Sequence, residues 1–522
     1  MISLSFTLIS TAADICAFMV LRLILRPLIG EGTVYFSLAQ DMFLLFYLGY
    51  AVPLRFSVCR ESMKVSDRGG DPENILKPCV GIGVLIGILY CLLLAVFAEI
   101  ISVKLFSMPY MYLSVLMTAP AVLLTMIACP FWAVVDAFTD AGAYMIRTLV
   151  RFVLIPVPSY IMALMGRNYG SKISQILMNP KEAEILGSAG AALGFSAGFL
   201  LIAVFYFILT PSALRKSRKK TPVAIDPKKI PALPSVLSTF LPAVFPGNVF
   251  MACVLVLLSF CGRSEEVTIT DIFWVVVGLD PYVIITAGLA CCVASLYMVH
   301  PMETVSSNER KKYGPRLSRS MRYAMAFSAP FSAVCCALAV PLQRLTVGGN
   351  DIPGYIQIFL AVLAPLAMIT MMLYFVSFED YTYPMATIVI TASFIFAHLA
   401  GLVFFDRAKG NGPYIIVLVY CLGFVLSSVI LVILRDISGR GRIRLRDLLV
   451  PLFAGIVLTV AAYIIRLLVD NLAGALTAVL VDIFLIYFIW LILMRVFRIL
   501  SADTVERFPG GSIAIMFGGE ED

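Results

Sequence analysis

The chain has 522 residues, of which 61% are hydrophobic and 14% are charged, and its formal net charge is +7. Soluble globular domains are about 25% charged, so this composition excludes that class. Apolar runs of about 20 residues, long enough for a helix to cross a bilayer, recur from end to end. They are too long and too uniform for the alternating strands of a transmembrane barrel. The basic residues lie in short loops between the runs, so no nucleic-acid partner is expected.

The apolar runs predict an all-α polytopic membrane protein with about fourteen transmembrane helices, whose first partner is the lipid bilayer. The first run lacks the basic n-region and the cleavage site of a signal peptide, so we interpret it as a retained helix. In chain order, the expected spans are 3–29, 35–57, 79–103, 110–135, 143–165, 187–210, 232–260, 271–298, 321–343, 354–377, 383–405, 412–434, 446–467 and 472–494.

The topology follows from the distribution of positive charge. Lys and Arg are concentrated in the loops after the second, sixth, eighth and twelfth expected spans, and again in the C-terminal tail. The loops after odd-numbered spans carry few basic residues. The positive-inside rule therefore predicts that the even-numbered loops and both termini are cytoplasmic.

The second half repeats features of the first. Pro53 and Glu61 recur at a constant offset as Pro301 and Glu309. Six spans per repeat is an even number, so the two repeats would run parallel in the membrane, and transporters often bind substrate between such repeats. The expected parts are a six-helix lobe (1–210), a cytoplasmic basic linker (211–231), a second six-helix lobe (232–435), an appended helix pair (436–495) and a cytoplasmic tail (496–522). The basic run of the linker could alternatively bind anionic lipid headgroups.

No enzyme signature is present. The chain lacks a P-loop, a G-x-S-x-G stretch and an H-E-x-x-H stretch, and it has only two His residues. None of its twelve Cys residues forms a C-x-x-C pair, so neither a zinc site nor a disulfide framework is expected. We therefore expect a protein that is not an enzyme and holds no cofactor and no resident metal.

The candidate functional residues are the charged residues inside expected spans, because a charge at the centre of a spanning helix costs about 2.5–3.5 kcal/mol. The first span carries Asp14, Arg22 and Arg26, spaced so that they share one side of a helix. Arg26 precedes Pro27 near the end of the span, where its side chain could extend to the interface. Arg22 and Asp14 could pair with each other or with Asp41 of the second span, as a structural network or a functional one.

The fifth span carries Arg147 and Arg151 on one stripe with Asp140, and Asp136 would join this stripe if the helix began early. Arg147 lies nearer the predicted cytoplasmic entrance and could reach the interface, whereas Arg151 lies one turn deeper. Arg151 is therefore the stronger candidate to face a polar cavity.

Two further candidates lie next to prolines. Arg55 follows Pro53 near the end of the second span, and Asp280 precedes Pro281 inside the eighth. A proline frees a backbone carbonyl, and a neighbouring carboxylate could help to hold a cation there; a simple helix kink is the alternative. Arginine side chains suit phosphate and pyrophosphate, whereas carboxylates suit H⁺, Na⁺ or an organic cation, and both kinds of site remain open.

Several stretches together resemble the multidrug/oligosaccharidyl-lipid/polysaccharide (MOP) exporter superfamily. They are Arg26-Pro-Leu-Ile-Gly-Glu-Gly after the first span, Gly70-Asp-Pro-Glu-Asn in the 53–77 loop, Arg147-Thr-Leu-Val-Arg151, Gly187-Ser-Ala-Gly-Ala-Ala-Leu-Gly, and Leu500-Ser-Ala-Asp-Thr-Val-Glu-Arg-Phe-Pro509. The resemblance covers nearly the whole chain. It implies a secondary transporter that works by alternating access as its two lobes rock.

Two branches of that superfamily differ in what they imply. The polysaccharide-biosynthesis branch, with the lipid II flippases and the stage V sporulation protein B group, implies export of a lipid-linked saccharide and a pyrophosphate site at Arg22, Arg55 and Arg151, with Arg26 and Arg147 as further candidates. The multidrug and toxin extrusion (MATE) branch implies an H⁺- or Na⁺-coupled antiporter of small organic cations, with Asp14 as the coupling residue and Asp41 and Asp280 as further cation-site candidates.

One stretch departs from the first branch: Phe131-Trp-Ala-Val-Val-Asp136 stands where an Arg-Gly-Tyr-Phe-x-Gly-like stretch is expected. The fourteen spans and the arginines of the fifth span favour the lipid-linked substrate, with the prokaryotic plasma membrane as the location. A third possibility is a non-transporting scaffold in envelope assembly. A net basic cavity in the first lobe would indicate the flippase, and a net acidic one with Asp14 buried would indicate the antiporter. The sequence sets no oligomeric state, and a monomer is compatible with it.

Overall fold

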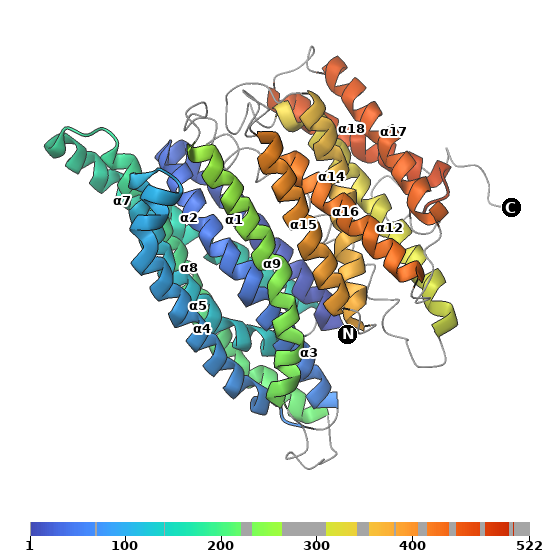
Figure 1. Ribbon diagram of the computed structural model, residues 1–522, viewed down its shortest axis with the longest axis horizontal. Coiled ribbons are helices and arrows are strands. Elements are labelled where there is room, and N and C mark those ends of the chain that lie inside the picture. The colour runs from blue at the N-terminus through green and yellow to red at the C-terminus, as the bar shows by residue number, and fades with distance from the viewer. Residues whose placement is uncertain are drawn as a thin grey trace. The chain divides into compact units, whose positions relative to one another are not determined.

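The computed structural model describes residues 2–67, 70–139, 141–220, 232–263, 310–341, 354–379, 383–405, 415–437, 445–469, 475–500 and 505. Within these ranges the chain is helical and contains no strand, as the apolar runs predicted (Figure 1). Contacts between residues divide the chain into two compact units, one built from α1 to α9 and the other from α12 to α18.

The first unit contains a long series of neighbouring helices. They are α1 (Ile2–Ile29), α2 (Gly32–Phe46), α3 (Val52–Asp67), α4 (Glu73–Glu99), α5 (Tyr112–Ala137), α6 (Ala141–Leu154), α7 (Pro156–Leu177), α8 (Glu182–Lys220) and α9 (Ala232–Arg263). Three short helical turns join them: η1 (Tyr47–Ala51), η2 (Ile100–Leu105) and η3 (Pro109–Met111). Helix α9 belongs by sequence to the range 232–435, and in the structure it packs against η1 and α3 of this unit.

The second unit is built from α12 (Arg310–Ala337), α14 (Gly354–Glu379), α15 (Tyr383–Phe405), α16 (Ile415–Ile437), α17 (Leu445–Val469) and α18 (Ala475–Val496). Its core lies where α12, α17 and α18 meet, around the buried side chains of Trp490, Leu458 and Ala326. The indole Nε1 of Trp490 donates a hydrogen bond of 2.9 Å to the carbonyl of Ala326. This bond joins α18 to α12, and the same two helices also bury Asp482 and Ser328.

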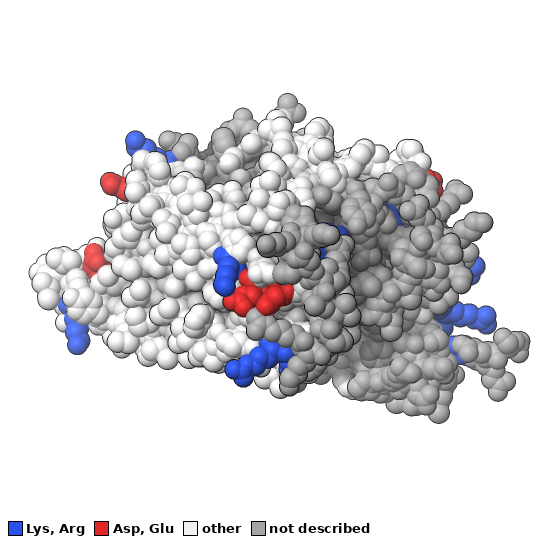
Figure 2. Space-filling model, turned by 90° about the horizontal axis from the view of Figure 1, so that it is seen from below, with Lys and Arg blue, Asp and Glu red and all other residues white. Residues whose placement is uncertain are grey.

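Eleven helical segments in the described ranges are long and apolar enough to cross a membrane. Every expected span except 271–298, which lies outside the described residues, overlaps a described helix. Helix α8 continues through residues 211–220, the first half of the range expected to be a linker. On the face seen in Figure 2, the described residues are largely uncharged, and Lys, Arg, Asp and Glu form small groups.

Small residues allow α7 and α8 to pack closely. Gly190, Gly194 and Gly198 recur every fourth residue along α8, so they share one face of that helix. A Cβ atom at Gly194 would overlap the backbone of Pro158, and one at Gly190 would overlap the backbone of Met162. Close backbone approach at small residues is a common way to pack helices in lipid, where no hydrophobic force joins them.

The long helices are interrupted at defined residues. Gly30 has a φ of +53° and makes the turn from α1 to α2, a backbone conformation that glycine adopts without strain. Pro156 begins α7 directly after Ile155, so α6 and α7 are separate helices within one expected span. Between α2 and α3 the helix continues through η1, a single π-helical turn. These breaks set the directions from which side chains enter the interior of the first unit.

Candidate functional site

The interior of the first unit holds buried charge. Within its described part, six charged side chains are at most 3% exposed. Three are arginines and three are aspartates, so their formal charges cancel. They are Asp14 and Arg22 on α1, Asp41 on α2, Arg55 on α3, Asp136 on α5 and Arg151 on α6. Ion pairs divide them into one pair and one group of four.

The pair consists of Arg22 and Asp41. The Arg22 guanidinium donates to an Asp41 carboxylate oxygen through Nη2 and to the side-chain oxygen of Gln40 through Nε, at 2.6 Å. Arg22 therefore pairs with Asp41, one of the two partners considered from the sequence. This pair and its hydrogen-bonded amide join α1 to α2.

Aromatic rings occupy the adjacent turns of the same two helices. Phe18 lies one turn from Asp14 and one turn from Arg22 on α1. Its ring meets those of Phe43 and Tyr47 of α2 and η1 edge to face, at centroid distances of 5.8 and 5.4 Å. These rings separate the Arg22–Asp41 pair from the other four charges, which we call the charge network: Asp14, Arg55, Asp136 and Arg151.

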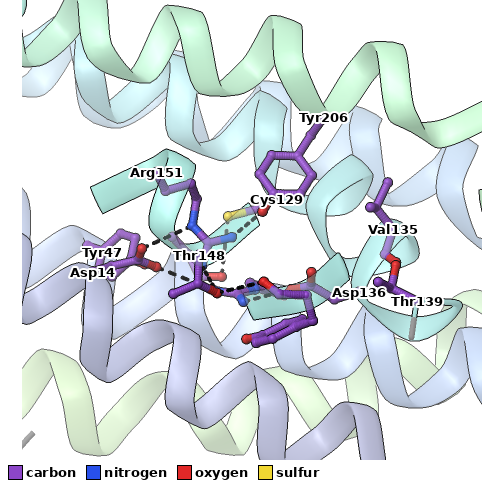
Figure 3. A network of polar contacts seen from close by, with 12 residues as sticks. Asp14, Tyr47, Cys129, Val135, Asp136, Thr139, Thr148, Arg151 and Tyr206 are labelled. Carbon is purple, nitrogen blue, oxygen red and sulfur yellow. Dashed lines mark hydrogen bonds and ion pairs between the residues drawn. The ribbon is translucent and has the colours of Figure 1, made fainter. Parts of the chain in front are cut away.

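Asp14 is the common acceptor at one end of the charge network. One carboxylate oxygen accepts a hydrogen bond of 2.9 Å from the Tyr47 hydroxyl and lies 3.7 Å from Nη1 of Arg55. The other oxygen accepts a hydrogen bond of 3.1 Å from Nε of Arg151. Figure 3 shows Arg151 and Tyr47 converging on this carboxylate from different elements. Asp14 thus contacts two arginines at once.

Trp132 of α5 holds the two arginines of the network. The guanidinium carbons of Arg55 and Arg151 lie 3.9 and 4.2 Å from the centre of its ring. A guanidinium over an indole ring gains about 0.5–2 kcal/mol by the cation–π interaction, and more when water is excluded. The Tyr206 ring of α8 stacks on Trp132 at 5.2 Å, and its hydroxyl accepts a hydrogen bond from Nη1 of Arg151. Two cationic groups therefore lie side by side on an aromatic platform.

Asp136 closes the other end of the network. Its Oδ2 atom accepts a hydrogen bond of 2.7 Å from Nη2 of Arg55. Its Oδ1 atom is buried and has no hydrogen-bond partner among the described residues, and the same holds for the indole Nε1 of Trp132. Asp136 lies one turn after Trp132 on α5. Two polar atoms on this helix therefore remain available for a further partner.

The π turn η1 places Tyr47 and Arg55 on the same side of their helix. In a continuous α-helix, two residues eight apart differ by about 80° in direction. A π turn takes up one extra residue, so the eight residues wind as about seven would, and the difference falls to about 20°. The hydrogen bond from the Val52 N–H to the Tyr47 carbonyl spans five residues and defines this turn. Both side chains can then reach Asp14.

The four residues of the charge network pair with one another, and their formal charges cancel. A buried charge without a partner is costly in a protein, and removing one member of a buried pair costs about 3–5 kcal/mol. Inside a bilayer each charge must be compensated by other protein groups, because no water is present to hydrate it. Two aspartates balance two arginines in the network, so it is neither net basic nor net acidic. The net charge of the described network alone therefore does not choose between the flippase and the antiporter.

The structure brings together most of the residues expected from the sequence. Asp14, Arg55 and Arg151 share the charge network, and Arg22 and Asp41 form the neighbouring pair. Arg26 and Arg147 are only partly buried, and neither is one of the four residues of the charge network. Asp280 and Asp140 lie outside the described residues.

Other members of the site were missed or misplaced. Asp136 was considered as an early residue of the fifth span, but it lies in α5 and reaches the network from there. The platform residues Trp132 and Tyr206 and the hydroxyl of Tyr47 were not expected to take part. An aspartate one turn after a tryptophan inside an apolar run was the signal that could have found the α5 pair.

A separate cavity of about 480 Å³ lies within the second unit. Helices α12, α14 and α17 line it, mostly with apolar side chains such as Ile358, Val362 and Ile456. Gln357 also lines it, and its side-chain oxygen lies 3.5 Å from Nη1 of Arg466. The cavity is suited to a flexible apolar chain.

Comparisons with known proteins identify the fold. No family model and no curated protein matches the sequence. Among solved structures, the lipid II flippase MurJ in an inward closed conformation matches with a TM-score of 0.57 and 16% identity, over 94% of this chain and 98% of that one. The eukaryotic MATE transporter AtDTX14 matches with a TM-score of 0.54 and 14% identity, over 82% of this chain and 95% of that one. At these identities the likeness shows the fold, which is the helical fold common to MurJ and MATE transporters, as the sequence motifs predicted.

Proposed function

We propose that this protein is a secondary transporter that works by alternating access and moves a lipid-linked saccharide precursor across the membrane. The observation that carries the proposal is the pair of buried guanidinium groups, Arg55 and Arg151, held against the one ring of Trp132. Guanidinium groups bind phosphate oxygens through paired, charge-assisted hydrogen bonds. Two of them on one platform suit a ligand with two linked phosphates, such as the pyrophosphate of an undecaprenyl-linked sugar.

The neutral state of the network suggests how binding is coupled to an ion. Asp14 already occupies hydrogen-bond donors of Arg151 and lies against Arg55. An anion that enters must replace this carboxylate as their counter-charge. A proton on Asp14, taken up on the same occasion, would leave the two arginines with a net positive charge for the anion. The coupling ion is then H⁺; Na⁺ bound at the same carboxylate would act in the same sense.

The cavity of the second unit supports a lipid-linked rather than a water-soluble anion. It is lined mostly by apolar side chains of three helices and has room for part of a long hydrocarbon chain. Its size and apolar lining suit a hydrocarbon segment of a lipid. The exposed large apolar side chains along α4, such as Leu85 and Val96, suit a helix that faces lipid.

A second candidate function is a MATE-type antiporter of organic cations, coupled to H⁺ or Na⁺. It is favoured by the burial of Asp14, which is 2% exposed and accepts a hydrogen bond from Tyr47. For this function a cation would replace Arg151 or Arg55 at the carboxylate. The two candidate functions differ in their need for the arginines. An anionic substrate needs them as ligands, whereas an organic cation does not.

Under either candidate the protein acts within the membrane, and we place it in a prokaryotic plasma membrane with both termini on the cytoplasmic side. The basic loops support the orientation, and the resemblance to the flippase branch is the ground for the location. Cysteine labelling of single sites in the loops of intact cells would test the orientation. Labelling of the basic segment 211–231 from outside the cell would contradict it.

The test is flipping in liposomes that contain the purified protein and a fluorescent undecaprenyl-pyrophosphate-linked sugar. We expect Arg55→Ala and Arg151→Ala each to lower the initial rate at least tenfold. Arg215→Ala is the control, because it removes the same kind of side chain from an exposed position on α8 outside the network, and its rate should stay near wild type. Equal rates in all variants would refute the flippase. Proton-driven uptake of an organic cation that persists in both arginine variants and stops in Asp14→Asn would establish the antiporter.

A further inference from the structure

The π turn η1 has properties beyond those needed to continue a helix. It is a single turn, Tyr47–Ala51, inside a helix that is otherwise α-helical on both sides. A π turn contains one residue more than the α-helix needs, and such turns occur frequently at functional sites. This one lies directly between two residues that both contact Asp14, namely Tyr47 and Arg55. A change in the turn would therefore act on the charge network itself.

The backbone of the turn has a partner outside its own helix. The carbonyl of Ala51 accepts a hydrogen bond from the thiol of Cys129 on α5, with a sulfur-to-oxygen distance of 3.5 Å. Carbonyl groups next to a π turn lose part of their regular bonding within the helix, and partners of this kind satisfy them. Cys129 is 1% exposed, so the bond is shielded from water. It stabilises the π form from the α5 side.

Helix α9 holds the turn from the opposite direction. Gly49 lies against the side chain of Asn248, and a Cβ atom at Gly49 would overlap that side chain. Gly247 lies equally close to the carbonyl of Leu48. Two glycines, one on each element, thus allow α9 to dock onto the π turn with almost no gap. The Asn248 side chain also donates a hydrogen bond of 3.0 Å to the Val244 carbonyl of its own helix, which fixes its direction.

We propose that η1 is a register switch, in which docking of α9 stabilises the π form and release of α9 lets the turn relax to an α-helix. The number of residues stays the same in this change. Helix α3 therefore turns about its axis by about 100° relative to α2, which is the angle that one residue occupies in an α-helix. Tyr47 and Arg55 then no longer face the same carboxylate. Arg55 leaves Asp14 and Asp136, and the charge network opens. The switch would regulate the proposed anion site. It depends on the proposed function only for the identity of the ligand.

The one extra residue of the π turn can be deleted, and this tests the switch directly. Deleting Leu48 removes the extra residue, so the helix becomes α-helical while Tyr47 and Arg55 keep their alignment. The deleted protein should hold the closed network and be unable to switch. Leu48→Ala is the matched control, because it removes the same side chain and leaves the number of residues unchanged. Asn248→Ala acts in the opposite direction, since it weakens the contact that holds the π form.

The experiment measures distances between spin labels by pulsed electron resonance in lipid nanodiscs of phosphatidylethanolamine and phosphatidylglycerol. One label replaces Lys64 of α3, whose side chain is 39% exposed. The second replaces Leu89 of α4 in one sample and Leu200 of α8 in another, which are 61% and 49% exposed. A turn of about 100° moves a side-chain end on α3 by about 8 Å, so at least one of the two distances must change. Samples are measured with and without inorganic pyrophosphate.

We expect two distance populations in wild type and in Leu48→Ala. Pyrophosphate should deplete the second population, because the proposed anion site needs Arg55 beside Arg151 and therefore exists only in the π form. We expect a single population in the Leu48 deletion and a larger second population in Asn248→Ala without any ligand. If the deletion does not fold, Asn248→Ala still decides: an unchanged single population in that variant overturns the switch. Two populations that persist unchanged in a folded deletion also overturn it. Flipping measured separately shows whether the proposed function has failed, because the distances do not depend on transport.

Discussion

Asp14 and Arg151 meet inside the first unit although 137 residues separate them in the sequence. The Nε atom of Arg151 donates a hydrogen bond of 3.1 Å to a carboxylate oxygen of Asp14, and both side chains are at most 2% exposed. The contact joins α1 to α6 and makes one carboxylate responsible for the charge of an arginine that a bilayer would otherwise exclude. The same contact therefore joins two helices of the first unit and lies within the proposed site.

Removing one member of this pair should destabilise the protein more than removing both. Arg151→Met leaves the network with an unbalanced negative charge, and a loss of about 3–5 kcal/mol is expected. Asp14→Leu together with Arg151→Met leaves Arg55 paired with Asp136 and restores neutrality. The double variant should therefore recover much of the loss. A double-mutant cycle of unfolding free energies in detergent measures this, and additive losses in the double variant would contradict the coupling.

The indole platform predicts a distinct effect on ligand affinity. Trp132→Leu removes the ring from two guanidinium groups, and each cation–π contact is worth about 0.5–2 kcal/mol. We expect affinity for a pyrophosphate lipid to fall by about tenfold or more, and Trp132→Phe to retain part of it. Calorimetric titration in nanodiscs measures both affinities.

Trp490→Phe is the control for this substitution. It removes a buried indole of the second unit, whose Nε1 donates to the Ala326 carbonyl. The variant should lose stability, by about 0.5–1.5 kcal/mol for the hydrogen bond, and keep its affinity. Equal losses of affinity in the two tryptophan variants would show that the effect of Trp132 is not specific to the arginines.

The close packing of α7 on α8 can be tested with two glycines that differ only in their surroundings. Gly194→Ala adds a methyl group that would overlap the backbone of Pro158, whereas Gly81→Ala, inside α4, adds one into open space. Ala is favoured over Gly inside a helix by about 0.5–1 kcal/mol. We expect Gly81→Ala to raise the thermal midpoint and Gly194→Ala to lower it. Shifts of the same sign would mean that α7 and α8 can separate freely.

The sequence predicted the helices well because hydropathy reports directly on burial in lipid. The all-α class and five of the buried charges (Asp14, Arg22, Asp41, Arg55 and Arg151) follow from it, because a charge inside an apolar run must be buried against other protein groups. The ends of the helices do not: α8, for example, continues to Lys220, ten residues past the expected span. The partners of these buried charges were harder to predict from the sequence. Arg22 had two possible partners by spacing, and only the fold selects Asp41.

The π turn could not have been read from the sequence. Its residues, Tyr47-Leu-Gly-Tyr-Ala51, are ordinary for a membrane helix, and one extra residue leaves no mark in composition. Counting Tyr47 and Arg55 on a regular helix separates them by about 80°, which would have placed Arg55 away from Tyr47 and Asp14. Asp136 was misplaced for a related reason, because the end of α5 and the beginning of α6 were not fixed by hydropathy alone.

The exchange of counter-charge at Asp14 is tested most directly by the affinity of carboxylate variants for undecaprenyl pyrophosphate, measured in nanodiscs. Asp14 occupies the guanidinium groups that the anion needs, so Asp14→Asn should bind the anion more tightly than wild type. Asp41→Asn, which lies in the neighbouring pair, should keep the wild-type affinity. An affinity that does not rise in Asp14→Asn, or binding that survives loss of both Arg55 and Arg151, would contradict the proposed site.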